Sequence, residues 1–461
     1  MNLKKNYLYI LFLPLFLNFF YNFLTTTPVE KFLNFNYYDL ISSLLLFLFL
    51  IVIGDLIKNS LQLVNKSISI VLYLLSFFIA DNIFTILSFG TNHFIVFLIV
   101  NSFWLIFLLS KKTKILDFTF LILSIALLNL YNHVFFNNLS RNKNVIGDVK
   151  DVHLQNVQNL YEKGYLYSMN NSSLEGYPQL VAYFQATLNR LSISIETFSN
   201  LSSAVNVLFF LTLLLVYETK ISNLGKFIMG MTFTVLIYNS EWLKLIFVDS
   251  LMTEGTLSYL LATILTGVVQ TKNKGSKNLR LVFLLLGTLY LGKQFISLLS
   301  LFAVIYFLLL KETRKFAIFG FLGLIVKELS FITAFKNLTK NYHLKQIDLV
   351  DTLFDILLFR DLKISNIQTI VRNLFLDKPT FLIFLIFFIL FGLSVFKKEA
   401  FNKDLMFYSS IILINFLLVF LLYVSVWRNM ELESPIRYFL NLLHLSIIYE
   451  FSIIEKIKKY K

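Results

Sequence analysis

Long apolar runs recur along almost the whole chain, and they constrain its fold more than any other feature. A helix needs about 20 predominantly apolar residues to cross the hydrocarbon core of a bilayer. Runs of about this length lie near residues 7–24, 40–57, 67–89, 92–110, 114–135, 200–218, 224–240, 251–270, 293–310, 316–335, 379–396, 405–427 and 436–455. A shorter run near 279–291 is expected to be tilted, re-entrant or fused with its neighbour. Because 57% of the residues are hydrophobic, a soluble protein of this length could not bury its apolar surface. The sequence therefore predicts an all-α fold, a polytopic transmembrane helical bundle of about 12–14 spans.

Basic residues cluster in every second connection between these runs, which predicts the orientation of the chain. Cytoplasmic connections of membrane proteins carry an excess of Lys and Arg. With the N-terminus inside, the predicted cytoplasmic connections hold Lys58, Lys66, Lys111, Lys112, Lys114, Lys220, Lys226, Lys272, Lys274, Lys277, Arg280, Lys311, Arg314, Lys315, Lys397, Lys398 and Lys403. Abundant Lys and Asn with little Trp is typical of AT-rich coding and favours a bacterium. We therefore expect an integral protein of a bacterial inner or plasma membrane with both termini cytoplasmic.

Two long connections, residues 136–199 and 336–378, are predicted to lie on the external side. The first is the longest polar interruption between apolar runs, so soluble chemistry is expected there. The second has apolar residues at helical spacing, which is typical of helices that lie on a membrane surface. Short connections join the first four spans. The predicted organisation is an N-terminal four-helix membrane region of residues 1–113 and a membrane module of residues 114–461.

The absence of Cys and the basic balance exclude several classes of function. With no Cys in the chain, disulfides, thiolate metal sites and cysteine nucleophiles are excluded. The net charge of +14 is explained by lysines at cytoplasmic helix ends. We therefore expect membrane lipid as a partner and no nucleic acid.

The external loop opens with carboxylates in the segment GDVKDVH, residues 147–153. If this segment is helical, Asp148 and Asp151 share a face, because they are three residues apart. Such a carboxylate can accept a proton from a hydroxyl or bind a divalent cation, Mg²⁺ or Mn²⁺. His153 joins a metal site only if the segment is a loop. The alternatives are a helix N-cap for the acids and a solvated surface histidine.

Three further residues at external positions are candidates for substrate binding. Tyr177 lies in the turn EGYP, where it can stack on a sugar or simply form a structural turn before a helix. Asp249 and Glu254 flank the outer end of the 251–270 span. Carboxylates there are costly unless they are paired or face water, so they predict a second acidic patch, with interfacial capping as the alternative.

Cationic residues at outer helix ends are candidates for binding a lipid phosphate. Lys293 lies between two apolar runs at a predicted external turn, and snorkelling to the interface is the alternative. Arg437 and Tyr438 open the last span. Arginine presents a planar fork that suits phosphate, whereas an internal pair of Glu433 with Arg437 is the structural explanation.

Four of these segments resemble the GT-C superfamily of membrane glycosyltransferases, which use polyprenyl-phosphate sugars. They are the acidic opening of the loop at Gly147-Asp148, the turn Gly176-Tyr177-Pro178, the step Lys293-Gln294 and the segment Ser434-Pro435-Ile436-Arg437-Tyr438. Their order and common external side span residues 114–461. The chain departs from the family in the four spans that precede the acidic loop, and in a Tyr-Pro-Gln where Tyr-Pro-Pro is usual.

The resemblance implies an inverting transfer of a sugar from a polyprenyl phosphate to a glycan, lipid or protein acceptor at the external face, as in cell-envelope glycan biosynthesis. It places the catalytic base or metal contact on Asp148, with Asp151 or Asp249 in support. Lys293 and Arg437 would stabilise the charge of the leaving phosphate. A divalent cation is optional, since only some members use one.

Two other functions fit a protein with many spans and a large external loop. A polysaccharide polymerase or ligase is expected to depend on Arg141, His153 and Arg190. A non-enzymatic transporter of lipid-linked glycans is expected to place polar residues in the middle of its spans and to show internal pseudo-symmetry.

Overall fold

A computed structural model of the chain confirms the all-α prediction: the described residues form helices and no strand. The structure describes residues 37–87, 92–111, 115–135, 154–170, 180–192, 202–240, 243, 253–275, 278–291, 294–336, 368, 370–372, 375, 377–396, 403–425 and 439–459. The predicted first span, residues 7–24, and the loop segment 337–367 lie outside this set.

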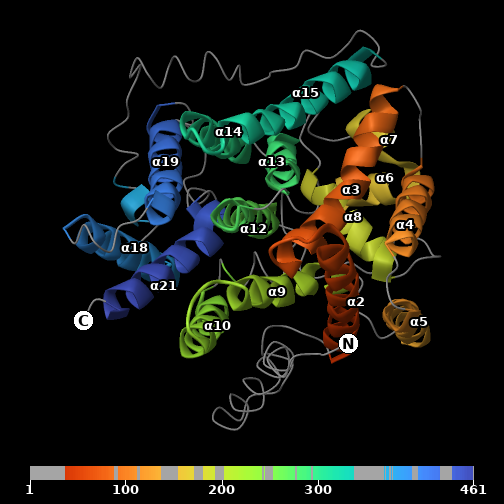
Figure 1. Cartoon of the computed structure of the whole chain (residues 1–461), viewed down its shortest axis with the longest axis horizontal. Coiled ribbons are helices and arrows are strands. Elements are labelled where there is room, and N and C mark those ends of the chain that lie inside the picture. The colour runs from red at the N-terminus through yellow and green to blue at the C-terminus, as the bar shows by residue number, and fades with distance from the viewer. Residues whose placement is uncertain are drawn as a thin grey trace.

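The helices follow the apolar runs closely (Figure 1). The N-terminal part contains α2 Tyr37–Leu61, α3 Lys66–Ile86, α4 His93–Ser110 and α5 Ile115–Val134. Three short helices come from the predicted external loop: α6 Gln155–Lys163, α7 Tyr165–Asn170 and α8 Leu180–Ser192. The rest of the chain forms α9 Ser202–Tyr217, α10 Asn223–Asn239, α12 Thr253–Asn273, α13 Leu279–Thr288, η6 Leu289–Leu291, α14 Gln294–Leu309, α15 Arg314–Lys336, α18 Lys378–Phe396, α19 Lys403–Ser425, η8 Leu440–Leu442 and α21 Leu443–Lys459.

Six of these helices are long and apolar enough to cross a membrane. They are Tyr38–Leu61, Lys66–Ile86, His93–Ser110, Leu116–Val134, Lys378–Phe396 and Lys403–Leu421. Three shorter apolar helices, Asn206–Tyr217, Leu279–Thr288 and Ile296–Leu309, also follow predicted spans. The helices thus indicate a multi-pass membrane protein, while the total of about 12–14 spans stays a prediction.

Hydrogen bonds gather the lysine-bearing connections at one end of the bundle, which we call the lysine end. The backbone N–H groups of Lys66 and Ser67 donate to the Glu218 carboxylate at 2.6 and 2.9 Å. Burial raises the pKa of Glu218, and these hydrogen bonds oppose that rise. Asn65 Nδ2 donates to Gln270 Oε1 at 3.0 Å. Connections far apart in the sequence therefore meet, as expected for antiparallel helices.

The opposite ends of these helices carry the remaining connections, and we call these helix ends together the loop end. Asn132, near the end of α5, accepts from Ser42 Oγ of α2 at 2.7 Å and donates to the carbonyl of Ser192 in α8 at 2.7 Å. Ser240, after α10, donates to the Asp377 carboxylate before α18 at 2.9 Å. This grouping agrees with the alternation read from the lysines, whereas the membrane face of each end stays a prediction.

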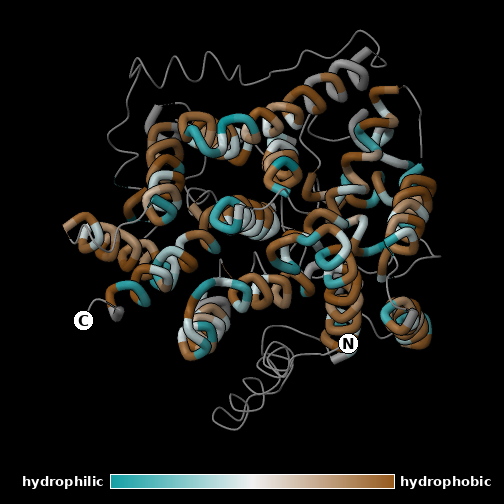
Figure 2. Tube along the Cα trace, in the orientation of Figure 1, coloured by the Kyte–Doolittle hydropathy of each residue, from teal (hydrophilic) through white to brown (hydrophobic). Residues whose placement is uncertain are grey.

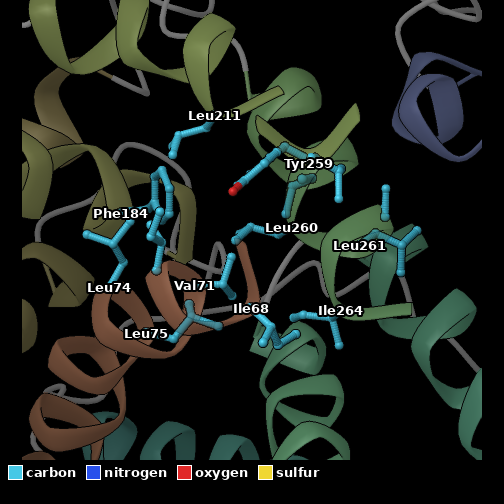
Figure 3. Close-up of a cluster of buried hydrophobic side chains, with 14 of the residues drawn as sticks. Ile68, Val71, Leu74, Leu75, Phe184, Leu211, Tyr259, Leu260, Leu261 and Ile264 are labelled. Atoms are coloured by element: carbon cyan, nitrogen blue, oxygen red, sulfur yellow. The ribbon is translucent and has the colours of Figure 1, made fainter. Parts of the chain in front are cut away.

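The centre of the bundle is apolar and involves helices from both predicted regions. In Figure 3 side chains of α3, α8, α9 and α12 form one buried cluster that contains Leu74, Phe184, Leu211 and Tyr259. Peripheral helices such as α4 and α18 are apolar over most of their length (Figure 2), and many of their side chains are exposed. Packing contacts thus cross the predicted boundary at residue 113.

Glycines allow α13 and α15 to approach until their backbones touch. A Cβ added at Gly323 would lie 2.1 Å from the backbone of Gly287, and one added at Gly287 would lie 2.4 Å from the carbonyl oxygen of Gly320. Small residues permit such close packing between membrane helices, where apolar side chains alone give little specificity. This crossing fixes α13, η6 and α15 relative to one another.

Candidate functional site

One predicted site residue, Glu254, lies within the described residues. It is in the first turn of α12 and its side chain is fully buried. A carboxylate in the first turn complements the positive end of the helix dipole. The other predicted site residues lie outside the described residues: Asp148, Asp151, His153, Tyr177, Asp249, Lys293, Arg437 and Tyr438. Their roles therefore stay predictions.

The helix α8, from the predicted external loop, is the most completely buried helix near the loop end. All 13 of its residues are buried, although the sequence LVAYFQATLNRLS includes Gln, Asn and Arg. It packs against α2, α3, α5, α6, α9 and α12. The loop thus contributes a central helix of the bundle.

Arg190 of α8 joins this helix to α4 and α6. Its Nε donates to His93 Nδ1 at 3.1 Å, and its Nη2 donates to the backbone carbonyl of Tyr161. The guanidinium carbon lies 3.7 Å from the centre of the Tyr161 ring, a cation–π contact. Because His93 Nδ1 accepts, the imidazole is neutral with its proton on Nε2, directed to Thr187 Oγ1 at 3.4 Å.

A second polar contact of α8 joins it to a buried carboxylate of α3. Tyr183 donates its hydroxyl to Asp81 Oδ2 of α3 at 2.9 Å, and both residues are buried. Burial and the neighbouring Asp81 carboxylate raise the pKa of Tyr183, so the phenol keeps its proton and remains a donor. Burial lowers the pKa of Arg190, but a guanidinium remains charged. We call Asp81, His93, Tyr161, Tyr183 and Arg190 the α8 cluster.

The α8 cluster also holds α6, which follows directly after the predicted acidic segment. The described part of this region begins at residue 154, so the structure does not test whether the acidic segment is a helix or a loop. The buried residues Val157, Leu160 and Tyr161 of α6 are spaced to lie on one face, and this face packs on α8. Gly164 ends the helix with a φ of 100°, a left-handed conformation that favours glycine.

A second buried group of polar residues lies between α9, α12 and α21, and we call it the polar seam. It consists of Thr212, Glu254, Ser258, Asn441 and His444. His444 Nε2 lies 2.8 Å from Thr212 Oγ1, and its Nδ1 lies 2.8 Å from Ser258 Oγ. All five residues are at most 3% exposed. Buried histidine, hydroxyl and carboxylate groups are expensive in a membrane bundle and mark candidate functional positions.

Most residues of both groups were not predicted from the sequence. Arg190 was predicted only as an essential residue of a polymerase or ligase, and no role was predicted for Asp81, His93, Ser258, Asn441 or His444. A signal was present, because Asp81 and His444 are ionisable residues inside apolar runs. The pairing of these residues depends on helix packing and had no local signature.

The described residues contain no group of three or more His, Asp or Glu side chains arranged to hold a metal ion. The predicted metal ligands, Asp148, Asp151 and His153, lie outside this set. The optional Mg²⁺ or Mn²⁺ site therefore stays a prediction.

No family model, curated protein or solved structure matches the chain. The resemblance to the GT-C superfamily thus rests on its four segments, and the function is proposed from them together with the geometry of the loop end.

Proposed function

We propose that this protein is a GT-C-type membrane glycosyltransferase that moves a sugar from a polyprenyl phosphate to an acceptor at the external face. The observation that supports it is that buried polar residues of α9, α12 and α21 meet in the polar seam. Glu254 of the seam is itself a predicted site residue, and Ser258 and His444 bring the outer starts of α12 and α21 together. Asp249 and Arg437 precede these two helix starts in the sequence.

The proposed reaction is a single displacement at the anomeric carbon of the sugar. The acceptor oxygen forms a bond to this carbon while the bond from the carbon to the phosphate oxygen breaks. The lipid phosphate leaves with the electron pair, and the acceptor proton moves to the Asp148 carboxylate. Lys293 and Arg437 stabilise the charge of the phosphate, and Asp151 or Asp249 supports the base. Inversion at the anomeric carbon follows from attack opposite the leaving group.

Other residues of the proposed site bind substrate. Tyr177 and Tyr438 would pack against the sugar, since aromatic rings offer apolar faces to sugar rings. A divalent cation would be held by Asp148, Asp151 and His153 and would supply positive charge that stabilises the phosphate. The steps above do not depend on this ion.

The contacts of Arg190 favour the glycosyltransferase over the polymerase or ligase. The latter was expected to use Arg190 on its substrate. Two of its donors instead bind His93 and the Tyr161 carbonyl, and its guanidinium lies over the Tyr161 ring. This arrangement assigns Arg190 a role in holding α4, α6 and α8 together.

The test uses the full chain reconstituted in vesicles with a panel of radiolabelled polyprenyl-phosphate hexoses and crude envelope acceptors. Wild type is expected to transfer label from at least one donor, and Asp148→Asn is expected to lower the rate by about 10²–10⁴-fold, because an amide does not accept the proton. Asp117→Asn, the same change at the lysine end of α5, serves as the matched control and should keep the wild-type rate.

Near wild-type transfer by Asp148→Asn would show that this residue is a helix cap and would refute its catalytic assignment. Movement of intact labelled lipid across the bilayer, with no transfer of sugar, would refute the enzyme and indicate the transporter.

A further inference from the structure

Within the seam, His444 of α21 makes hydrogen bonds to both α9 and α12. Thr212 Oγ1 donates to the Leu208 carbonyl at 2.9 Å, so toward His444 it acts as an acceptor. His444 Nε2 therefore carries the proton, and Nδ1 accepts from Ser258 Oγ. Both ring nitrogens are thus engaged. His444 sets the position of α21 against α9 and α12.

Asn441 and Glu254 lie about one helical turn before His444 and Ser258, toward the starts of their helices. The helices α12 and α21 both start at the loop end, because η8 packs on α12 while Asn273 and Glu455 make their contacts at the lysine end. Glu254 precedes Ser258 by four residues, and Asn441 precedes His444 by three, so each lies on the same face as its seam partner. Glu254 and Asn441 therefore lie in the first turn of α12 and in η8, two elements that pack against each other.

Asn441 is a residue of the seam whose side-chain amide lacks a hydrogen-bond partner among the described residues. It is 0% exposed, and neither its Nδ2 nor its Oδ1 has a hydrogen-bond partner within the part of the chain that the structure describes. A buried polar group without a partner destabilises the fold by about 1–3 kcal/mol. A ligand that supplied the missing partners would remove this penalty on binding.

The chemistry of the two groups selects the kind of ligand. An amide offers two donors and one accepting oxygen, which matches hydroxyl groups that both donate and accept. A carboxylate accepts hydrogen bonds from hydroxyls but repels a phosphate. The combination therefore suits a neutral, hydroxyl-bearing group and does not suit an anion.

We propose that the seam is a subsite for the sugar ring of the donor, in which Asn441 and Glu254 bind sugar hydroxyls and His444 holds α21 in place. This inference rests on the proposed function and adds a location for the sugar, separate from the cationic residues that would bind the phosphate. Asn441 is then a residue that determines specificity for the sugar.

The experiment compares the binding of two probes by the full chain in nanodiscs. The first is a polyprenyl phosphate without sugar, and the second is the same lipid carrying glucose, galactose, mannose or N-acetylglucosamine. Wild type is expected to bind one glycosylated lipid about 10-fold more tightly than the bare lipid phosphate. Asn441→Leu should remove this preference and leave the affinity for the bare lipid unchanged.

Asn189→Leu is the matched control. Asn189 of α8 is equally buried, and its amide atoms likewise lack partners in the described part of the chain, but it lies outside the seam. This variant should keep the preference for the glycosylated lipid. Should Asn441→Leu fail to fold, the isosteric Asn441→Asp removes both amide donors and should show the same loss.

The same measurement distinguishes failure of the sugar subsite from failure of the proposed function. If Asn441→Leu retains the wild-type preference, or if wild type binds the bare lipid and every glycosylated lipid equally, the subsite is wrong and lipid-phosphate binding stands. If wild type binds none of the probes, the proposed function fails and the subsite fails with it.

Discussion

The α8 cluster and the polar seam are both buried groups of polar residues at the loop end, but they differ in how their hydrogen bonds are completed. In the α8 cluster the cation of Arg190 and the carboxylate of Asp81 each have protein partners. In the seam His444 is engaged on both sides, whereas the Asn441 amide has no partner among the described residues. The α8 cluster is therefore suited to holding helices together. The polar seam has an amide that can still form hydrogen bonds to a ligand.

This difference predicts which substitutions destabilise the protein and which alter binding. Loss of one partner from a completed buried network leaves the other partner unsatisfied. Replacement of a group that has no partner removes a penalty. Unfolding in detergent micelles is the measurement that separates the two cases.

The largest effect is expected for Arg190→Met in the α8 cluster. This change leaves His93 Nδ1 and the Tyr161 carbonyl without their donor and removes a cation–π contact, so the free energy of unfolding should fall by about 3–5 kcal/mol. Lys163→Met is the matched control, since Lys163 is a cation that donates to the Tyr167 hydroxyl and lies over the Tyr167 ring, but at an exposed position of α6. The control should be nearly neutral. Equal stability of the two variants would contradict the role of Arg190 as a brace.

A smaller effect is expected for Tyr183→Phe. The change removes one hydroxyl and leaves the buried Asp81 carboxylate with one donor fewer, which should lower the free energy of unfolding by about 1–3 kcal/mol. Tyr73→Phe removes an equally buried hydroxyl whose acceptor, Asn101 Oδ1 at 2.7 Å, is neutral. Denaturant titration should show a smaller loss for Tyr73→Phe, because hydrogen bonds to charged acceptors are stronger. The reverse order would mean that Asp81 is not ionised.

The smallest effect on stability is expected for Asn441→Leu in the absence of ligand. Because the amide has no partner in the described part of the chain, its replacement breaks no hydrogen bond and removes a desolvation penalty, so the free energy of unfolding should not fall. Asn132→Leu is the comparison, since Asn132 bridges Ser42 and the Ser192 carbonyl and should lose about 1–3 kcal/mol. If both variants lose the same amount, Asn441 is a structural residue and the contrast between seam and cluster disappears.

The burial of α8 could not be predicted from its own sequence. By its polar residues this segment belongs to an external loop, yet all 13 residues are buried, whereas α4 has a higher hydropathy and exposes Phe103 and Ile106. A soluble protein would show the opposite order. In a membrane protein the lipid solvates apolar side chains, so exposure does not follow polarity.

The helices and the grouping of the lysine-bearing connections could be predicted from local features of the sequence. Backbone groups in a bilayer must be satisfied within the helix, so each apolar run near 20 residues predicts its element. The alternation of lysines predicted which connections lie together, and the contacts of Glu218 with Lys66 and Ser67 agree with it.

The pairing of polar residues, in contrast, depends on how the helices pack. Tyr183 and Asp81 are 102 residues apart, and His444 and Thr212 are 232 apart. Hydropathy and periodicity describe one helix at a time, and they carry no information on which helix faces which. The α8 cluster and the polar seam exist because packing brings single polar residues of separate helices within hydrogen-bond distance, where burial makes each pairing matter.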